Sequence, residues 1–239
     1  MRRSRKSLAA ARRKRLAAAL SGAAFILVGI LIICLLIGKG QRAAFVLSEE
    51  QLMQVLDTNS KLSGELSGEL SSELSSELSQ DKQKLVDSCV SLVGKVGYFW
   101  GGKSSADGWD ERWGVPTVVE SSGSETTGTV RPFGLDCSGY VTWAFLQLDR
   151  DDVNMTEAIG HGTWKQWENS SEITWEELSV GDLAFQNEYP GSSGNHVGIC
   201  IGFLDGEPVF AHCSFTENCV VVTNAGDIFR YPRRPSVFE

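Results

Sequence analysis

Basic residues are scarce in most of this chain. Eight of its 22 Lys and Arg residues lie in positions 1–15, which contain no acidic residue, so positions 16–239 carry 14 basic and all 30 acidic side chains. A body with a net charge of −16 excludes a nucleic-acid-binding protein whose basic face lies in its folded domain. The contrast with the +8 terminus also excludes a simple cytosolic globule. A hydrophobic content of 42% and seven Trp residues exclude a wholly disordered chain.

Charge is absent from residues 16–38, an apolar run that includes the stretches 25–28 and 30–33. At about 1.5 Å per residue the run is roughly 34 Å long, enough to cross a bilayer core of ~30 Å. The sequence therefore predicts a transmembrane anchor over 16–38, with the basic segment 1–15 in the cytoplasm and the rest outside. A cleaved signal peptide is the alternative, but the run is long and no clear small-x-small site follows it. Cys34 is interpreted as an apolar filler within the run.

Residues 39–80 have few signs of a folded domain. A capping-box pattern beginning at Ser48 predicts a short helix over 48–57. Leu then recurs every four residues from Leu62 to Leu78, with Glu, Gly and Ser between. A four-residue period drifts by about 40° per repeat on a helix, so a long coiled coil is not expected. The segment is predicted to be a juxtamembrane helix followed by a flexible or partly helical stalk, with a partner-binding helix as the alternative.

The composition of residues 81–239 is that of a folded domain. Apolar spacing predicts one helix that ends near Gly94 and a second over 135–148. Four short apolar runs follow, at 182–185, 196–203, 208–212 and 219–223. Helices followed by strands predict an α+β fold in which helices pack on an antiparallel sheet.

Histidine is rare as well, with three residues in the chain, which restricts the choice of a catalytic base. Cys137 opens the second predicted helix, where backbone N–H groups and the helix dipole favour a thiolate. His196 and His212 lie on two predicted strands, and strand alternation places His196 on the face of Gly198. A Cys/His/His site for nucleophilic catalysis is one interpretation. A buried structural cysteine is the other.

The chain contains five short blocks, in the order Tyr-x-Trp-Gly-Gly (98–102), Leu-Asp-Cys-Ser-Gly-Tyr (135–140), Val-Gly-Asp-Leu (180–183), His-Val-Gly-Ile (196–199) and Phe-Ala-His-Cys (210–213). In this order they resemble the NlpC and p-sixty family of cell-wall cysteine peptidases. The resemblance covers roughly residues 85–235. It implies a papain-like fold over 81–239 and hydrolysis of peptidoglycan stem peptides.

The resemblance also implies roles for individual residues. Cys137 would be the nucleophile, His196 the general base and His212 the polar residue that orients it. The expected substrate-binding residues are Tyr98, Trp100, Asp136 and Ser138. His161 also falls near the positions where relatives contact substrate, although a solvent-facing loop histidine is the favoured interpretation.

The insertion over 103–134 departs from familiar family members, in which the first two blocks lie closer together. It resembles that of clostridial-type, membrane-anchored relatives from conjugative elements, so conjugation or cell-wall machinery is a possible partner. Its Trp109 and Trp113 could plug the core, or the insertion could form a wall of the substrate cleft.

No metal or cofactor is expected, because the spacing of Cys213 and Cys219 after His212 is not a usual zinc pattern. A disulfide between these two cysteines is conceivable. The resemblance implies, as the leading hypothesis, a cysteine endopeptidase that cuts the bond between D-isoglutamate and a diamino acid. The alternatives are a papain-like amidase that cuts between glycan and peptide, and a non-catalytic wall-binding scaffold.

Overall fold

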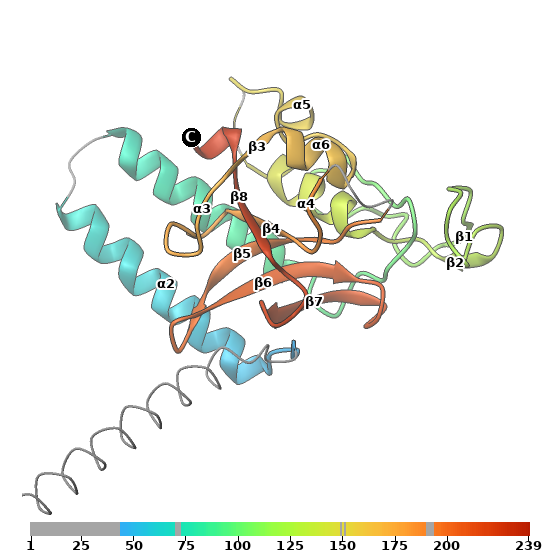
Figure 1. Cartoon of the computed structure of the whole chain (residues 1–239), viewed down its shortest axis with the longest axis horizontal. Helices are drawn as coiled ribbons and strands as arrows, with labels where there is room; N and C mark the ends of the chain where they lie inside the picture. The colour runs from blue at the N-terminus through green and yellow to red at the C-terminus, as the bar shows by residue number, and fades with distance from the viewer. Residues whose placement is uncertain (1–43, 70–72, 149, 151, 190–193) are drawn as a thin grey trace, which may run out of the picture. The chain divides into compact units, whose positions relative to one another are not determined.

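The computed structural model describes residues 44–239, apart from 70–72, 149, 151 and 190–193 (Figure 1). Its helices are, in chain order, α2 (Glu49–Glu69), α3 (Glu73–Ser91), α4 (Cys137–Leu146), α5 (Met155–Ile159), α6 (Gly162–Glu168) and the 3-10 helix η1 (Ser236–Phe238). Its strands are β1 (Pro116–Val118), β2 (Val130–Pro132), β3 (Ser170–Glu172), β4 (Leu183–Phe185), β5 (Val197–Leu204), β6 (Glu207–Ser214), β7 (Cys219–Asn224) and β8 (Tyr231–Pro235).

A six-stranded antiparallel sheet forms the centre of the domain, in the order β3-β8-β4-β5-β6-β7. The helix α4 packs on β5 and β6 and is buried along nearly all of its length (Figure 1). Such an all-round apolar helix has to lie in the core rather than on the surface. The predicted α+β architecture with helices on an antiparallel sheet is confirmed.

The two faces of β5 and β6 belong to different apolar clusters. Val197 and Ile199 belong to the large cluster around α4, whereas Phe210 and Phe229 belong to a smaller cluster on the other face. A Cβ on Gly198 would lie 2.6 Å from the Phe229 ring, so glycine is required there. This second face is the one to which the strand alternation assigns His196.

Strand β8 is absent from the sequence prediction because it contains Pro232 and Pro235. Proline lacks the N–H that a ladder requires, so such a segment does not resemble a central strand. In the sheet, β8 nevertheless lies between β3 and β4, and Pro232 pairs with Ala184. The carbonyl oxygen of Pro232 still accepts a hydrogen bond from Ile173 N at 3.3 Å, so the residue can still be hydrogen-bonded to a neighbouring segment.

Residues 44–59 are part of the domain, which corrects the expectation that the fold begins at 81. Leu47 N donates to Val222 O at 2.8 Å, and Val46 forms a β-bridge with Thr223, so this segment covers the exposed edge of β7. Unpaired edges of sheets are commonly covered in this way. The first turns of α2 then pack on β5, where Asn59 Nδ2 donates to Ile201 O at 2.6 Å.

The remainder of the expected stalk is helical where it is described. The helix expected over 48–57 continues as α2, and the backbone of the Leu repeat belongs to α2 and α3 on either side of 70–72. Burial of Val55 gives α2 a reason to persist, because its apolar face covers β5. Tertiary packing therefore stabilises the first turns of α2, as it does most helices in proteins.

The predicted anchor at 16–38 lies outside the described residues and stays a prediction. No helix within residues 44–239, as far as they are described, is long and apolar enough to span a membrane.

Candidate active site

Cys137 is the first residue of α4, as the sequence predicts. Asp136 caps this helix, because its side chain accepts a hydrogen bond from Gly139 N at 2.7 Å. A Cβ on Gly139 would lie 2.1 Å from the carbonyl oxygen of Gly102. The glycines of the first two sequence blocks therefore allow two backbones to touch, and this contact fixes the start of the nucleophile helix.

The two predicted histidines form a hydrogen-bonded chain. His196 Nε2 lies 2.8 Å from His212 Nδ1, and His212 Nε2 lies 3.1 Å from Thr223 Oγ1. With Thr223 as the last acceptor, one consistent arrangement has His212 donating to Thr223 and His196 donating to His212. The Nδ1 atom of His196 then carries a lone pair and can accept a proton.

The ring of His196 is held by packing as well as by hydrogen bonding. It stacks on Phe229 at 5.6 Å between ring centroids, with an interplanar angle of 23°. His212, from β6, meets the same Phe229 edge-on at 5.3 Å. Both histidines thus lie on the sheet face predicted for His196, with their orientation fixed from two directions.

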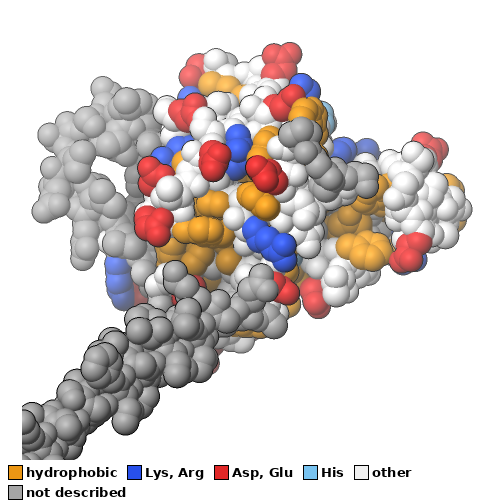
Figure 2. Space-filling view, in the orientation of Figure 1, with side chains coloured by type: hydrophobic (Ala, Val, Ile, Leu, Met, Phe, Trp, Pro, Cys, Tyr) orange, Lys and Arg blue, Asp and Glu red, His pale blue; other side chains and the backbone are white. Residues whose placement is uncertain are grey.

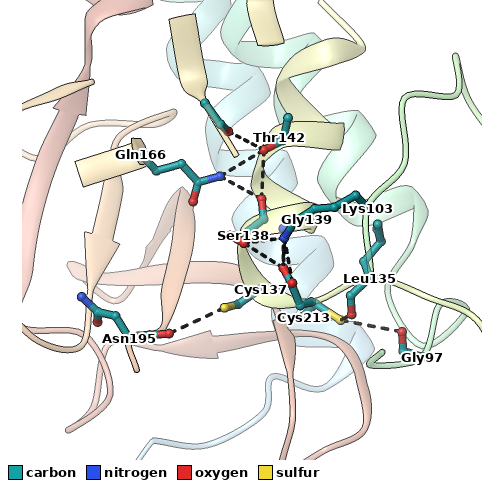
Figure 3. Close-up of polar contacts among 12 residues, drawn as sticks. Gly97, Lys103, Leu135, Cys137, Ser138, Gly139, Thr142, Gln166, Asn195 and Cys213 are labelled. Atoms are coloured by element: carbon teal, nitrogen blue, oxygen red, sulfur yellow. Dashed lines mark hydrogen bonds and ion pairs between the residues drawn. The ribbon is translucent and has the colours of Figure 1, made fainter. Parts of the chain in front are cut away.

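Cys137 and the two histidines line one cleft with a volume of ≈ 570 Å³. Cys137 comes from the α4 side of the sheet, and its thiol points toward the carbonyl oxygen of Asn195, 3.8 Å away (Figure 3). Asn195 directly precedes His196, which stands just ahead of β5. Cys137 and His196 therefore line the same cleft at the end of this strand, although they come from opposite faces of the sheet.

Burial governs the protonation of the resting site. It raises the pKa of the Cys137 thiol to about 12, with a further increase from the Asp136 carboxylate, and Lys103 and the backbone of Val197 and Ser138 oppose this only in part. Burial likewise lowers the pKa of His196 to about 4. Burial therefore outweighs the preference for a thiolate that the start of the helix provides. In the resting site the Cys137 thiol and the His196 imidazole are therefore both neutral.

Lys103 is a site residue that the sequence analysis missed. Its Nζ lies 2.6 Å from Asp136 Oδ1 and 2.7 Å from Ser138 Oγ (Figure 3). These two residues flank Cys137 in the sequence. The positive charge of Lys103 lowers the pKa of Cys137. A lysine after two glycines resembles an ordinary loop residue, so only its contact with the helix cap reveals this role.

We expect Lys103→Met to slow the reaction of Cys137 with iodoacetamide several-fold at a given pH. Removing the ammonium group leaves the Asp136 carboxylate unpaired beside the thiol, and both changes raise the pKa of Cys137. The measurement is the alkylation rate as a function of pH, with thermal unfolding recorded for each protein. Lys95→Met, in an exposed turn, is the matched control and should leave the profile unchanged. An unaltered profile in Lys103→Met would contradict the electrostatic role.

The four predicted substrate-binding residues separate into two pairs. Tyr98 and Trp100 line the cleft beside Cys137. Asp136 and Ser138 are buried, and their side chains bond to Lys103 and to each other rather than lining the cleft. Their contacts with substrate stay a prediction. In the structure these side chains stabilise the first turn of α4.

Gln166 of α6 supports the nucleophile helix from behind. Its side-chain Nε2 donates to Ser138 O at 2.8 Å and lies 3.1 Å from Thr142 Oγ1. Thr142 in turn donates to Gly160 O at 2.8 Å. Figure 3 shows this chain of contacts reaching the first turn of α4. It braces the turn that carries Cys137.

The insertion over 103–134 fulfils both roles considered for it, in different parts. Trp113 is buried and packs edge-on against Trp143 at 5.6 Å, whereas Trp109 is half exposed. Residues 123–125 instead line the cleft. His161 is exposed and does not line the cleft, as the favoured interpretation expects.

The cysteines of the described part of the chain are all free thiols. Cys213 is buried and donates to Leu135 O at 3.1 Å, whereas Cys219 lies at the start of β7 and is partly exposed. In the ladder of β6 and β7, Cys213 pairs with Val220 and Cys219 with Ser214. The conceivable disulfide between the two is not formed.

Two solved structures are among those similar to this chain. RipB of Mycobacterium tuberculosis, described as a peptidoglycan hydrolase, is 23% identical over 78% of this chain and 85% of its own, with a TM-score of 0.45. The NlpC/p60 domain of the peptidoglycan hydrolase SagA is 22% identical over 64% of this chain and 97% of its own, with a TM-score of 0.40. No curated protein matches the chain. The resemblance of the insertion to relatives from conjugative elements stays a prediction.

A sequence model of one family also matches the chain directly, over residues 95–229. This region contains all five sequence blocks, the cleft and the three residues Cys137, His196 and His212. Since the match covers more than half of the chain, the protein belongs to the NlpC/P60 family.

Proposed function

We propose that this protein is a peptidoglycan hydrolase, a cysteine endopeptidase that cleaves stem peptides between D-isoglutamate and the following diamino acid. The observation that carries the proposal is the placement of Cys137 in one cleft with the chain His196–His212–Thr223. Membership in the NlpC/P60 family supports the substrate class, because SagA and RipB are described as peptidoglycan hydrolases.

The arrangement supports a two-step mechanism. The Cys137 sulfur attacks the amide carbonyl carbon while its proton passes to His196. His196 then gives this proton to the departing amine, and a thioester remains on Cys137. Water attacks the thioester with His196 as base, which releases a carboxylate and restores the thiol. The transient imidazolium is stabilised through the contact of His196 Nε2 with His212.

The neutral resting pair suits this sequence of steps. Transfer of a proton within the cleft needs no separated thiolate and imidazolium before substrate arrives. His212 and Thr223 are buried, so they keep the Nε2 side of His196 away from water and leave Nδ1 as the basic atom. A disabled scaffold would have no chemical use for such an intact chain of donors and acceptors, which favours an enzyme.

The bond that is cut is tested by mass spectrometry of muropeptides after digestion. The protein should begin at residue 44, because residues 44–59 pack on the catalytic sheet, and Cys137→Ala is the matched control. Disaccharide-linked dipeptides together with free peptides that begin at the diamino acid are expected. Intact stem peptides released from glycan would instead identify the amidase alternative, and an unchanged digest would reject hydrolysis.

For location we propose a single membrane span at 16–38 with the catalytic domain outside the cell. The +8 segment before the span supports this orientation. Protease added to intact spheroplasts should remove the domain and spare an N-terminal epitope tag. A domain protected from protease until the membrane is lysed would show that the orientation is wrong.

A further inference from the structure

The inserted segment contributes a wall of the active-site cleft. Gly123, Ser124 and Glu125 line the same cavity as Cys137 and His196. These residues lie in the loop that joins β1 to β2. The hairpin formed by the two strands protrudes from the domain in Figure 1. In the view of Figure 2 the protruding lobe is mostly uncharged polar surface, with few charged side chains.

The wall is tied to the rest of the cleft by Trp100. The Trp100 ring nitrogen Nε1 donates to Ser122 O at 2.9 Å. A Cβ on Gly123 would lie 4.0 Å from the same indole ring, so the backbone passes close to it. Trp100 belongs to the first family block and itself lines the cleft. This contact fixes residues 122–125 against the site.

Hydrogen bonds within the turn hold Glu125 in place. Thr127 Oγ1 donates to Ser121 O at 2.8 Å, and Ser124 Oγ lies 2.9 Å from Thr126 Oγ1. The base of the turn is closed by Gly128 N, which donates to Val119 O at 2.8 Å. A loop fixed in this way needs little reordering when it binds a ligand.

Glu125 is the one charged side chain among the described residues that line the cleft, apart from the two histidines. Both histidines are kept neutral, since burial lowers their pKa values. The carboxylate of Glu125 is exposed and has no hydrogen-bond or ion-pair partner within the described part of the chain. The aromatic rings of Tyr98 and Trp100 line the same cavity, and aromatic faces attract cations.

We propose that Glu125 binds an ammonium group of the peptide substrate, which makes the insertion a specificity element for amine-bearing peptides. This inference rests on the proposed function and names a feature of its substrate. Two sources of the amine have the same chemistry. One is the side chain of the diamino acid after the cleaved bond, and the other is the free N-terminus of a stem peptide already released from glycan.

Peptide binding to the full-length Cys137→Ala protein tests the proposal without depending on turnover. The probes are a stem tripeptide with both amines free, the two singly acetylated forms and the doubly acetylated form. Glu125→Gln in this background should weaken binding of the tripeptide with both amines free roughly fivefold. If a singly acetylated peptide binds the parent and Glu125→Gln proteins with equal affinity, its acetylated amine is the one that Glu125 binds. The effect should shrink at high salt, because the pair is exposed.

Glu120→Gln is the matched control, since it removes the same charge from an exposed position of the insertion that does not line the cleft. Equal affinities of Glu125→Gln and its parent for the tripeptide with both amines free would overturn the proposal. An equal loss for the doubly acetylated form would also overturn it, because that loss would be structural. Failure of the otherwise unaltered enzyme to cleave any of these peptides, with Glu125-dependent binding preserved, would overturn the proposed function alone.

Discussion

Cys137→Ala is expected to reduce peptidoglycan hydrolysis by roughly 10⁴-fold or more. The change removes the sulfur that attacks the carbonyl, and no other nucleophile of the described site is placed to replace it. Cys213 is buried with its thiol bonded to Leu135 O, so it cannot take over. Release of muropeptides with time, measured at equal protein concentration, provides the comparison.

Two other thiols supply the controls for this experiment. Cys200 lies in the apolar cluster on the face of the sheet opposite α4, and Cys219 is partly exposed on β7. Cys200→Ala and Cys219→Ser should keep activity within a few-fold, because neither thiol lines the cleft. Thermal unfolding should show that Cys137→Ala is folded. Substantial hydrolysis by a folded Cys137→Ala protein would reject the cysteine-peptidase mechanism.

His196→Ala should lower kcat by a factor of roughly 10² to 10⁴, the usual contribution of a general base. His212→Asn should cost less, about tenfold, because an asparagine carbonyl oxygen can still accept the hydrogen bond from His196 Nε2. The measured quantity is kcat for one soluble muropeptide. Equal losses in the two variants would show that His212 does more than orient the base.

The pH dependence of kcat/KM gives this pair a second measurement. Burial lowers the pKa of His196 to about 4, so the imidazole stays in its neutral, basic form well below pH 6.5. The acidic limb of the profile should therefore fall between roughly pH 4 and 5. Phe229→Ala exposes the ring of His196, which should raise its pKa and move the limb toward pH 6.5. A limb near pH 6.5 in the unmodified enzyme would contradict burial of the base.

Much of the site could be predicted because its chemistry lies in short blocks. Cys137 at a helix start and His196 ahead of a strand are local patterns, and the structure brings both into one cleft. Thr223 and Phe229 could not be predicted in the same way, since their importance depends on which strands and loops become neighbours. Thr223 gave one weak signal, as a polar residue in an apolar strand.

The fold was predictable where apolar periodicity is strong and less so where tertiary contacts decide. Helix α4 and strands β4 to β7 follow their sequence patterns closely. Strand β8 does not, because Pro232 conflicts with local strand rules and is tolerated only through the pairing of its neighbours. The sequence predicts the helix over 48–57 but leaves it outside the folded domain, because no local pattern shows that Val55 of α2 is buried against Gly202 of β5.

A protonated nucleophile is slow to oxidise. Peroxides and disulfides react with the thiolate, and burial raises the pKa of Cys137 to about 12, so the thiol is protonated at pH 7. An unperturbed cysteine would be ionised to a few per cent. In the location proposed above, outside the membrane and beyond the reducing systems of the cytoplasm, the burial that keeps the thiol protonated would also preserve it chemically between turnovers.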